Sequence, residues 1–251
     1  DQVGPMARGV RGLGLLLDAM AGFDAACAES RPAPAIATYD PGDAPDAGGM
    51  VVGRLADVDD IEIEAPVRAA FANAADVLRD LGCPVRDMSL GGYDLDRGRL
   101  AGLMVAVGHA SSFHAADLRE RAEQLSPLLR GALEFGRDAE VGRLVWAERK
   151  VAELIVCLRT AFEGVDVLVL PTTLEAAFSF DQRAPDAQAD FTAIASMAGL
   201  PAVSVPMGVS DDGLPLGLQI VGRAFADADV LRVARAFERA IALDLCPARF
   251  S

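Results

Sequence analysis

The sequence has very little lysine: of its 23 Lys and Arg residues, only Lys150 is a lysine. It has no run of basic residues, and 37 acidic residues give the chain a net charge of −14. A field of this sign repels phosphate backbones and anionic lipids. We therefore expect neither a nucleic acid nor a membrane surface as a partner.

The sequence also lacks long hydrophobic runs and paired cysteines. Its apolar stretch at residues 165–170 is far too short to span a bilayer, and Asp166 interrupts it. No CxxC pair and no histidine at ligand spacing occur near the cysteines, which are Cys27, Cys83, Cys157 and Cys246. Neither a disulfide nor a zinc site is indicated. We expect a cytoplasmic protein without a metal or another cofactor, in which the thiols are buried structural side chains.

Periodicity predicts an α/β fold with a mixed sheet. Strands at 50–55 and 84–90 flank a helix at 65–81, which is the length expected of a parallel strand–helix–strand unit. An Asp-Gly turn joins strands at 202–207 and 215–222 into a hairpin. A buried strand is expected at 165–170, and a surface connection at 31–49. The other expected helices are 10–22, 100–116, 118–137 with a break at Pro127, 140–162, 191–198 and 227–242.

Two stretches that could suggest a catalytic base have simpler interpretations. In HASSFH, His109 and His114 lie five positions apart, which rotates them by about 140° around a helix. No GxSxG motif occurs in the chain. Lys150 is flanked by Glu148, Arg149 and Glu153, as expected of a solvated helix face. We therefore interpret both stretches as ordinary helical segments.

Polar residues near the ends of predicted strands are the candidates for a ligand site. Thr172 and Thr173 follow the buried strand, and Asp190, Thr192 and Ser196 precede a Gly-Leu-Pro turn. Sheets of α/β proteins place their ligand contacts at such strand ends. The same residue types also cap helices and turns. The residues alone do not decide between these two interpretations.

Three stretches resemble the amidase signature family. They are DQVGPMAR at 1–8, VDVLVLPTT at 165–173, and FTAIASMAGLPAVSVPMG followed by DGLPLGLQIVGR from residue 191 onward. Their order and spacing resemble the later half of that family. The resemblance implies an α/β/α fold around a mixed central sheet. Residues 1–251 are then expected to be the C-terminal part of a single amidase domain.

The resemblance also implies hydrolysis of a carboxylic amide C–N bond. Family members use a lysine, a bridging serine in a cis peptide and a nucleophilic serine, while N–H groups of a Gly/Ser-rich loop hold the oxyanion. In that family the lysine and the GSSxGGS-like loop precede DQVGPMAR, and nothing in this sequence matches them. We therefore expect no catalytic residue within 1–251 and no activity of this chain alone. The substrate-binding residues that we expect are Thr172, Thr173, Asp190 and Ser196.

The departures from the family pattern leave the substrate class open. Leu174 stands where family members often have proline, and Ser196 where many have asparagine. We expect a small-molecule amide as the substrate. The alternatives are a non-catalytic amidase-like binding protein and a partner subunit similar to the A subunit of a tRNA amidotransferase, which the acidic charge disfavours. A sheet cut partway through exposes a strand edge and an apolar face, so we also expect homo-oligomers or poor solubility.

Overall fold

A computed structural model of the chain describes residues 3–27, 30–32, 47–243 and 245. It has the predicted mixed α/β architecture, with five strands in one sheet in the order β2-β1-β3-β5-β4. The strands are β1 Val52–Leu55, β2 Val85–Met88, β3 Val167–Pro171, β4 Ala202–Val209 and β5 Pro215–Gly222. The helices are α1 Val10–Met20, α2 Ala65–Asp80, α3 Leu95–Phe113, α4 Ala115–Glu120, α5 Pro127–Arg137, α6 Val141–Ala161, α7 Thr192–Ala198 and α8 Asp227–Ile241, with short 3₁₀ helices at Ala56–Asp60 and Ala122–Gln124.

The strand pairing follows from the connections. Strand β1 lies parallel to both β2 and β3, and α2 connects β1 to β2, which confirms the predicted parallel unit. Strand β5 is antiparallel to β3 and to β4. In the predicted hairpin turn, Gly213 has a φ of 76°, and its N–H donates to the Ser210 carbonyl at 2.9 Å. The left-handed φ explains the glycine at this position.

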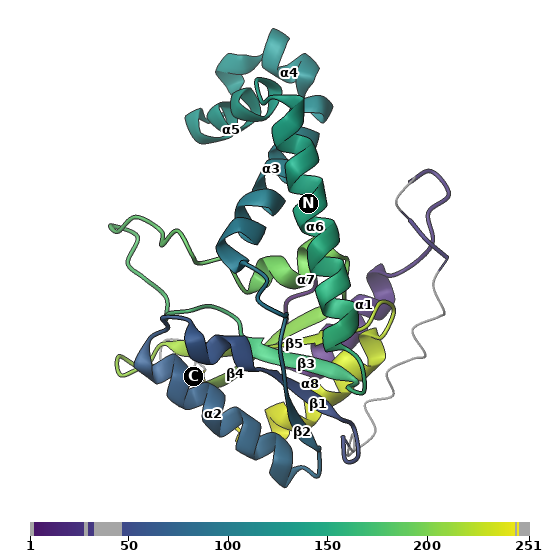
Figure 1. The fold of residues 1–251 in the computed structure, drawn as a ribbon, viewed down its shortest axis with the longest axis vertical. Helices are drawn as coiled ribbons and strands as arrows, with labels where there is room; N and C mark the ends of the chain where they lie inside the picture. Colours follow the sequence, from purple (N-terminus) through teal and green to yellow (C-terminus); the bar gives the residue numbers. More distant parts are fainter. Residues whose placement is uncertain (1–2, 28–29, 33–46, 244, 246–251) are drawn as a thin grey trace.

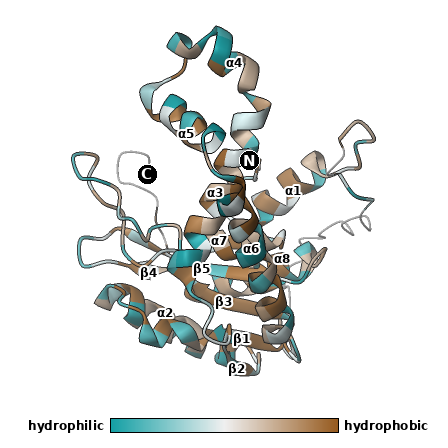
Figure 2. Ribbon diagram, turned by 45° about the horizontal axis from the view of Figure 1, so that its top comes forward, coloured by the Kyte–Doolittle hydropathy of each residue, from teal (hydrophilic) through white to brown (hydrophobic). Residues whose placement is uncertain are grey.

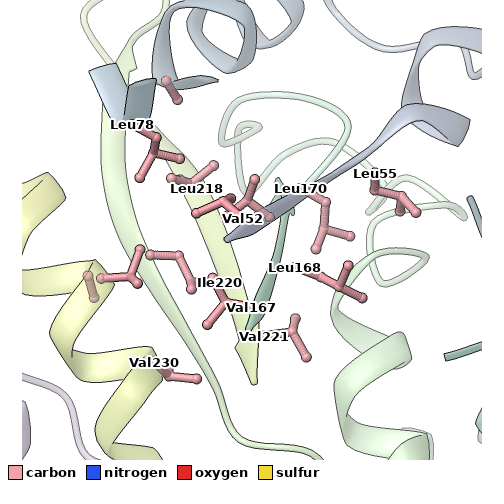
Figure 3. Packing of buried hydrophobic residues seen from close by; sticks show 14 of the residues in the cluster. Val52, Leu55, Leu78, Val167, Leu168, Leu170, Leu218, Ile220, Val221 and Val230 are labelled. Carbon is pink, nitrogen blue, oxygen red and sulfur yellow. The ribbon is translucent and has the colours of Figure 1, made fainter. Parts of the chain in front are cut away.

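Helices cover the two faces of the sheet unequally. Helices α2 and α8 pack on one face, with α1 against α8 (Figure 1). On this face Leu218 and Ile220 of β5 lie beside Leu78 of α2, while Val230 of α8 packs nearby (Figure 3). The other face carries α7 and the last turns of α6 (Figure 1). Figure 2 shows the central strands β1, β3 and β5 mainly in the hydrophobic colour, as expected for strands covered on both sides.

A helical extension projects away from the sheet. Helices α3 and α6 run side by side, and α4 and α5 lie at their far end (Figure 1). The predicted break at Pro127 is confirmed, because Pro127 occupies the first turn of α5 and the Ser126 hydroxyl accepts a hydrogen bond from Leu129 N at 3.3 Å. Helix α5 approaches α3 closely at Gly136, where a Cβ atom would lie 2.2 Å from the Val107 carbonyl oxygen.

Some boundaries and one side-chain prediction differ from expectation. Helix α3 begins at Leu95 rather than at residue 100, because the Asp94 carboxylate caps it by accepting from Arg97 N at 3.0 Å. Cys83 is buried, as predicted, and its thiol donates to the Ala47 carbonyl. Cys27 is exposed, so the prediction of a buried thiol is wrong there. Cys246 and most of the predicted connection at 31–49 lie outside the described residues.

None of the helices in the described ranges combines the length and the apolar character that crossing a bilayer requires.

Candidate substrate site at the ends of three strands

A cavity of about 390 Å³ opens where β3 ends and extends over β4 and β5. This volume is within the range of small-molecule sites. Its lining comes from the end of β3 and the loop that follows, from Gln188 and from both hairpin strands. The lining residues are Thr172, Thr173, Glu175, Ala176, Ala177, Phe178, Gln188, Ser204, Val205, Pro206, Pro215, Leu216 and Gly217.

The alternation of strand β4 explains why this part of the sheet is open. Val205 and Met207 are buried on the face covered by α2 and α8. Ser204 and Pro206 alternate with them and therefore lie on the opposite face, where both are exposed. Within the described residues no helix covers this corner of the sheet, since α7 lies farther along it. The cavity therefore has a rigid floor of paired strands.

A pair of hydroxyl groups lies at the centre of this floor. Thr172 continues the ladder of β3 by donating its N–H to the Gly217 carbonyl at 2.8 Å. Its Oγ1 lies 2.6 Å from Ser204 Oγ, so the two side chains form a hydrogen bond across strand β5. A Cβ atom at Gly217 would lie 2.6 Å from Thr172 Oγ1 and 2.7 Å from Ser204 Oγ. The absence of a side chain at Gly217 is therefore what allows the pair to form.

The loop after β3 is held by the start of helix α2. Glu64 donates its backbone N–H to the Leu174 carbonyl at 3.0 Å, and its carboxylate accepts from Ala176 N at 2.9 Å. Within the loop, the Thr173 hydroxyl donates to the Glu175 carbonyl at 2.8 Å. These bonds fix the backbone on both sides of Glu175. One wall of the cavity is therefore tied to the helical layer.

The structure separates the four residues predicted to bind substrate. Thr172 and Thr173 line the cavity described above. Ser196 lines a second opening of about 870 Å³ between α3 and α7. Gln188 lines both, so the two openings are neighbours on either side of this residue. Asp190 is not among the lining residues of either opening.

Asp190 instead forms an ion pair that joins α3 to the segment before α7. Its Oδ1 accepts from Arg99 Nε at 2.6 Å, and the two side chains are only 12% and 16% exposed. Burial raises the pKa of the Asp190 carboxyl, although the Arg99 guanidinium opposes this change. Burial acts to lower the pKa of Arg99, but the hydrogen bonds and charges of Asp190 and Asp96 together outweigh burial, and the pKa is raised. A role of Asp190 in substrate binding stays a prediction, beside this visible structural role.

The histidine and lysine stretches lie in helical segments, as expected. HASSFH spans the end of α3, where the Ser111 hydroxyl donates to the Gly108 carbonyl at 2.8 Å. His114 Nδ1 lies 2.9 Å from the Asp117 carboxylate. Lys150 Nζ pairs with Glu153 on α6 at 2.5 Å. Among the described residues, no group of three or more His, Cys, Asp and Glu side chains could hold a metal ion.

Sequence reasoning missed Glu175, Gln188, Ser204 and Gly217 as members of the cavity. The signal for Ser204 was present, because alternation in AVSVPM places Ser204 and Pro206 on one face and three apolar residues on the other. Gly217 could be found only from the register of β5 against β3 and β4, which brings it between the two hydroxyls. Glu175 and Gln188 lie in a long loop, where spacing predicts no contacts.

Known proteins resemble this chain over nearly its whole length. The family model described as Amidase matches residues 1–231. The A subunit of the glutamyl-tRNA(Gln) amidotransferase of Rhodospirillum rubrum is 34% identical over an alignment of 279 positions. The alignment covers 99% of this chain and 55% of that relative. The mitochondrial A subunit of the same name from Mus musculus is 36% identical over 232 residues, which cover 77% of this chain and 44% of that relative.

Solved structures show the same fold. A bacterial aryl acylamidase of the amidase signature family superposes with a TM-score of 0.79 at 23% identity, covering 94% of this chain and 52% of that one. The A subunit of the glutamyl-tRNA(Gln) amidotransferase from Thermotoga maritima superposes with a TM-score of 0.75 at 25% identity. The superposition covers 95% of this chain and 52% of that one. The chain thus spans about half the length of the relatives that it matches. The family match and these similarities show that the chain belongs to the amidase family.

Proposed function

We propose that this chain supplies the substrate-pocket half of an amidase, a hydrolase that cleaves a carboxylic amide C–N bond. The observation that carries the proposal is the cavity at the ends of β3, β4 and β5, with the Thr172–Ser204 hydroxyl pair on its floor. In α/β sheets, ligands bind at strand ends, where loops can vary without disturbing the core. Because the chain belongs to the amidase family, we expect the ligand in this cavity to be an amide.

The reacting groups come, in this proposal, from a segment outside residues 1–251. A serine hydroxyl is a weak nucleophile unless a base lies beside it. Within the described chain, Lys150 pairs with Glu153, and the floor hydroxyls Thr172 and Ser204 bond to each other rather than to a base. A lysine, a bridging serine and a nucleophilic serine of the amidase signature type would have to face the open side of the cavity. This chain's own residues then bind and orient the amide.

A second candidate function is that of a component similar to the A subunit of a glutamyl-tRNA(Gln) amidotransferase. The curated relatives with 34% and 36% identity carry that name, and a structure of such a protein shares the fold. The net charge of −14 argues against direct contact with tRNA through this chain. A non-catalytic amidase-like binding protein is the remaining alternative. Each of these roles would be carried out in the cytoplasm, to which the scattered thiols are suited.

The test is reconstitution with an upstream half. The N-terminal half of the Rhodospirillum rubrum relative is fused ahead of residue 1 or supplied in trans, and ammonia release is measured from a panel of simple aliphatic and aryl amides. We expect hydrolysis by the reconstituted protein and none by residues 1–251 alone, because loss of the base and nucleophile costs several orders of magnitude in rate.

The control is the same fusion with the nucleophilic serine of the upstream half replaced by alanine, which should abolish hydrolysis. A folded fusion that binds amides without hydrolysing any of them would favour the non-catalytic alternative. Ammonia release only in the presence of glutamyl-tRNA and further protein components would favour the amidotransferase alternative.

A further inference from the structure

The cavity over β4 and β5 has an unbalanced charge. Among its lining residues, all within the described chain, Glu175 is the only acidic one, and none is basic. The Glu175 side chain is half-buried, and no Arg, Lys or His of the described ranges pairs with it. The neighbouring Glu64 carboxylate is directed at the same loop, where it accepts from Ala176 N. The wall of the cavity therefore carries negative charge without a compensating cation.

The hydroxyl pair limits the number of hydrogen bonds that the floor of the cavity can donate. Each of Thr172 and Ser204 has one hydroxyl hydrogen, and their mutual bond uses one of the two. One O–H remains to donate into the cavity, which suits a single acceptor such as an amide carbonyl oxygen. A carboxylate needs several donors or a cation to replace its hydration. The floor cannot supply them, and the side-chain amide of Gln188, which also lines the cavity, is a neutral donor and not a cation.

From these two features we infer that the cavity selects neutral or cationic amides and rejects amides that carry a carboxylate. The inference rests on the proposed function, because it names the substrate class of the same site. Two like charges about 6 Å apart weaken binding by about threefold in water and on the order of 100-fold at an effective dielectric constant of 20. For a partly open cavity we expect a discrimination of about tenfold.

Three four-carbon amides test this selection on the soluble fraction of the 251-residue chain, because ligand-observed NMR does not require a monomer. They are butyramide, which is neutral, 4-aminobutyramide, which is a cation, and succinamate, which is an anion. Dissociation constants are measured by ligand-observed NMR at constant ionic strength, up to about 10 mM, where fragments of this size bind. We expect 4-aminobutyramide to bind most tightly, followed by butyramide, with succinamate about tenfold weaker than the cation.

A charge-neutral variant identifies the group that discriminates. Glu175→Gln keeps the size of the side chain and should bring the three affinities to within about twofold of one another. The matched control is Glu123→Gln in the helical extension, which removes an exposed carboxylate far from the cavity and should leave the order unchanged.

Three outcomes overturn the inference: succinamate binding as tightly as the other two, an unchanged order of affinities in Glu175→Gln, and no binding of any probe. The proposed function is judged separately. Selective binding without hydrolysis after reconstitution would leave the inference standing and refute the amidase proposal. Hydrolysis with a preference for succinamate would support the amidase proposal and refute the inference.

Discussion

Two glycines in helix α5 should respond in opposite ways to the same substitution. A Cβ atom at Gly131 would meet no atom within 4 Å outside its own helix. At Gly136 it would lie 2.2 Å from the carbonyl oxygen and 2.6 Å from the carbonyl carbon of Val107 in α3. Backbone atoms cannot rotate away as a side chain can. Gly131→Ala should therefore stabilise the protein, whereas Gly136→Ala should destabilise it.

The magnitudes follow from helix propensity and packing. Alanine is more favourable than glycine in a helix interior by about 1 kcal/mol, which is the expected gain at position 131. At position 136 the two helices must separate by about 1 Å, and we expect the overpacking to cost about 3 kcal/mol, the upper end of its usual range, because the atoms met belong to the backbone. After the propensity gain is subtracted, we expect a net destabilisation of about 2 kcal/mol. For a chain of this length, 1 kcal/mol shifts Tm by about 2–4 °C.

Thermal unfolding followed by circular dichroism at matched protein concentration measures both variants. We expect Tm to rise by about 2–4 °C for Gly131→Ala and to fall by about 4–8 °C for Gly136→Ala. Amide hydrogen exchange of α5 peptides should change in the same directions, because the contact is local. Equal shifts in both variants, or an increase in stability from Gly136→Ala, would show that α5 does not pack on α3 in this way.

Further predictions concern a tyrosine, an ion pair and the isolated chain. Burial, together with the charges of Glu153, Cys157 and Asp94, raises the pKa of Tyr93 to about 12. Because Tyr93 ionises at lower pH in the unfolded chain, this group lowers the stability of the folded protein as pH rises from about 10 to 12. In Tyr39→Phe, Tyr93 is the one tyrosine of the sequence that is left. Absorbance at 295 nm of this variant should show the late titration, and a midpoint near pH 10 would contradict it. Asp190→Ala leaves the Arg99 cation without its most buried partner and should cost about 1–3 kcal/mol in urea unfolding; an additive double-mutant cycle with Arg99→Ala would exclude their coupling. Residues 1–251 alone should release no ammonia from amides and should elute as an oligomer or aggregate in size-exclusion chromatography; a monodisperse monomer that melts cooperatively would contradict the expectation of an incomplete sheet.

The elements were predictable wherever their signals were local. The parallel unit around α2, the hairpin at Gly213 and the break at Pro127 each depend on a short stretch whose periodicity or turn residues allow one structure. The start of α3 was missed because its capping carboxylate, Asp94, precedes the apolar periodicity that was used to find the helix. Local sequence therefore accounts for most of the fold.

The site was only partly predictable because it depends on register between strands. Thr172 and Thr173 follow a buried strand, and their place at its end could be inferred from the chain alone. The contact of Thr172 with Ser204 crosses strand β5, and no local pattern specifies which residue of β5 lies between them. The pairing of Asp190 with Arg99 likewise joins residues far apart in sequence.

The most direct test of the central claim is the kcat/KM of the reconstituted protein after removal of a hydroxyl from the cavity floor. Ser204→Ala and Thr172→Val each delete one hydroxyl with little change in volume, and a lost hydrogen bond of about 1 kcal/mol corresponds to roughly fivefold in kcat/KM. We predict a loss of this size or larger for neutral amides, with Tm within about 2 °C of the parent, whereas Gly131→Ala leaves kcat/KM unchanged. Unchanged kcat/KM and unchanged amide preference in both hydroxyl variants of a stable, active fusion would contradict the placement of the substrate in this cavity.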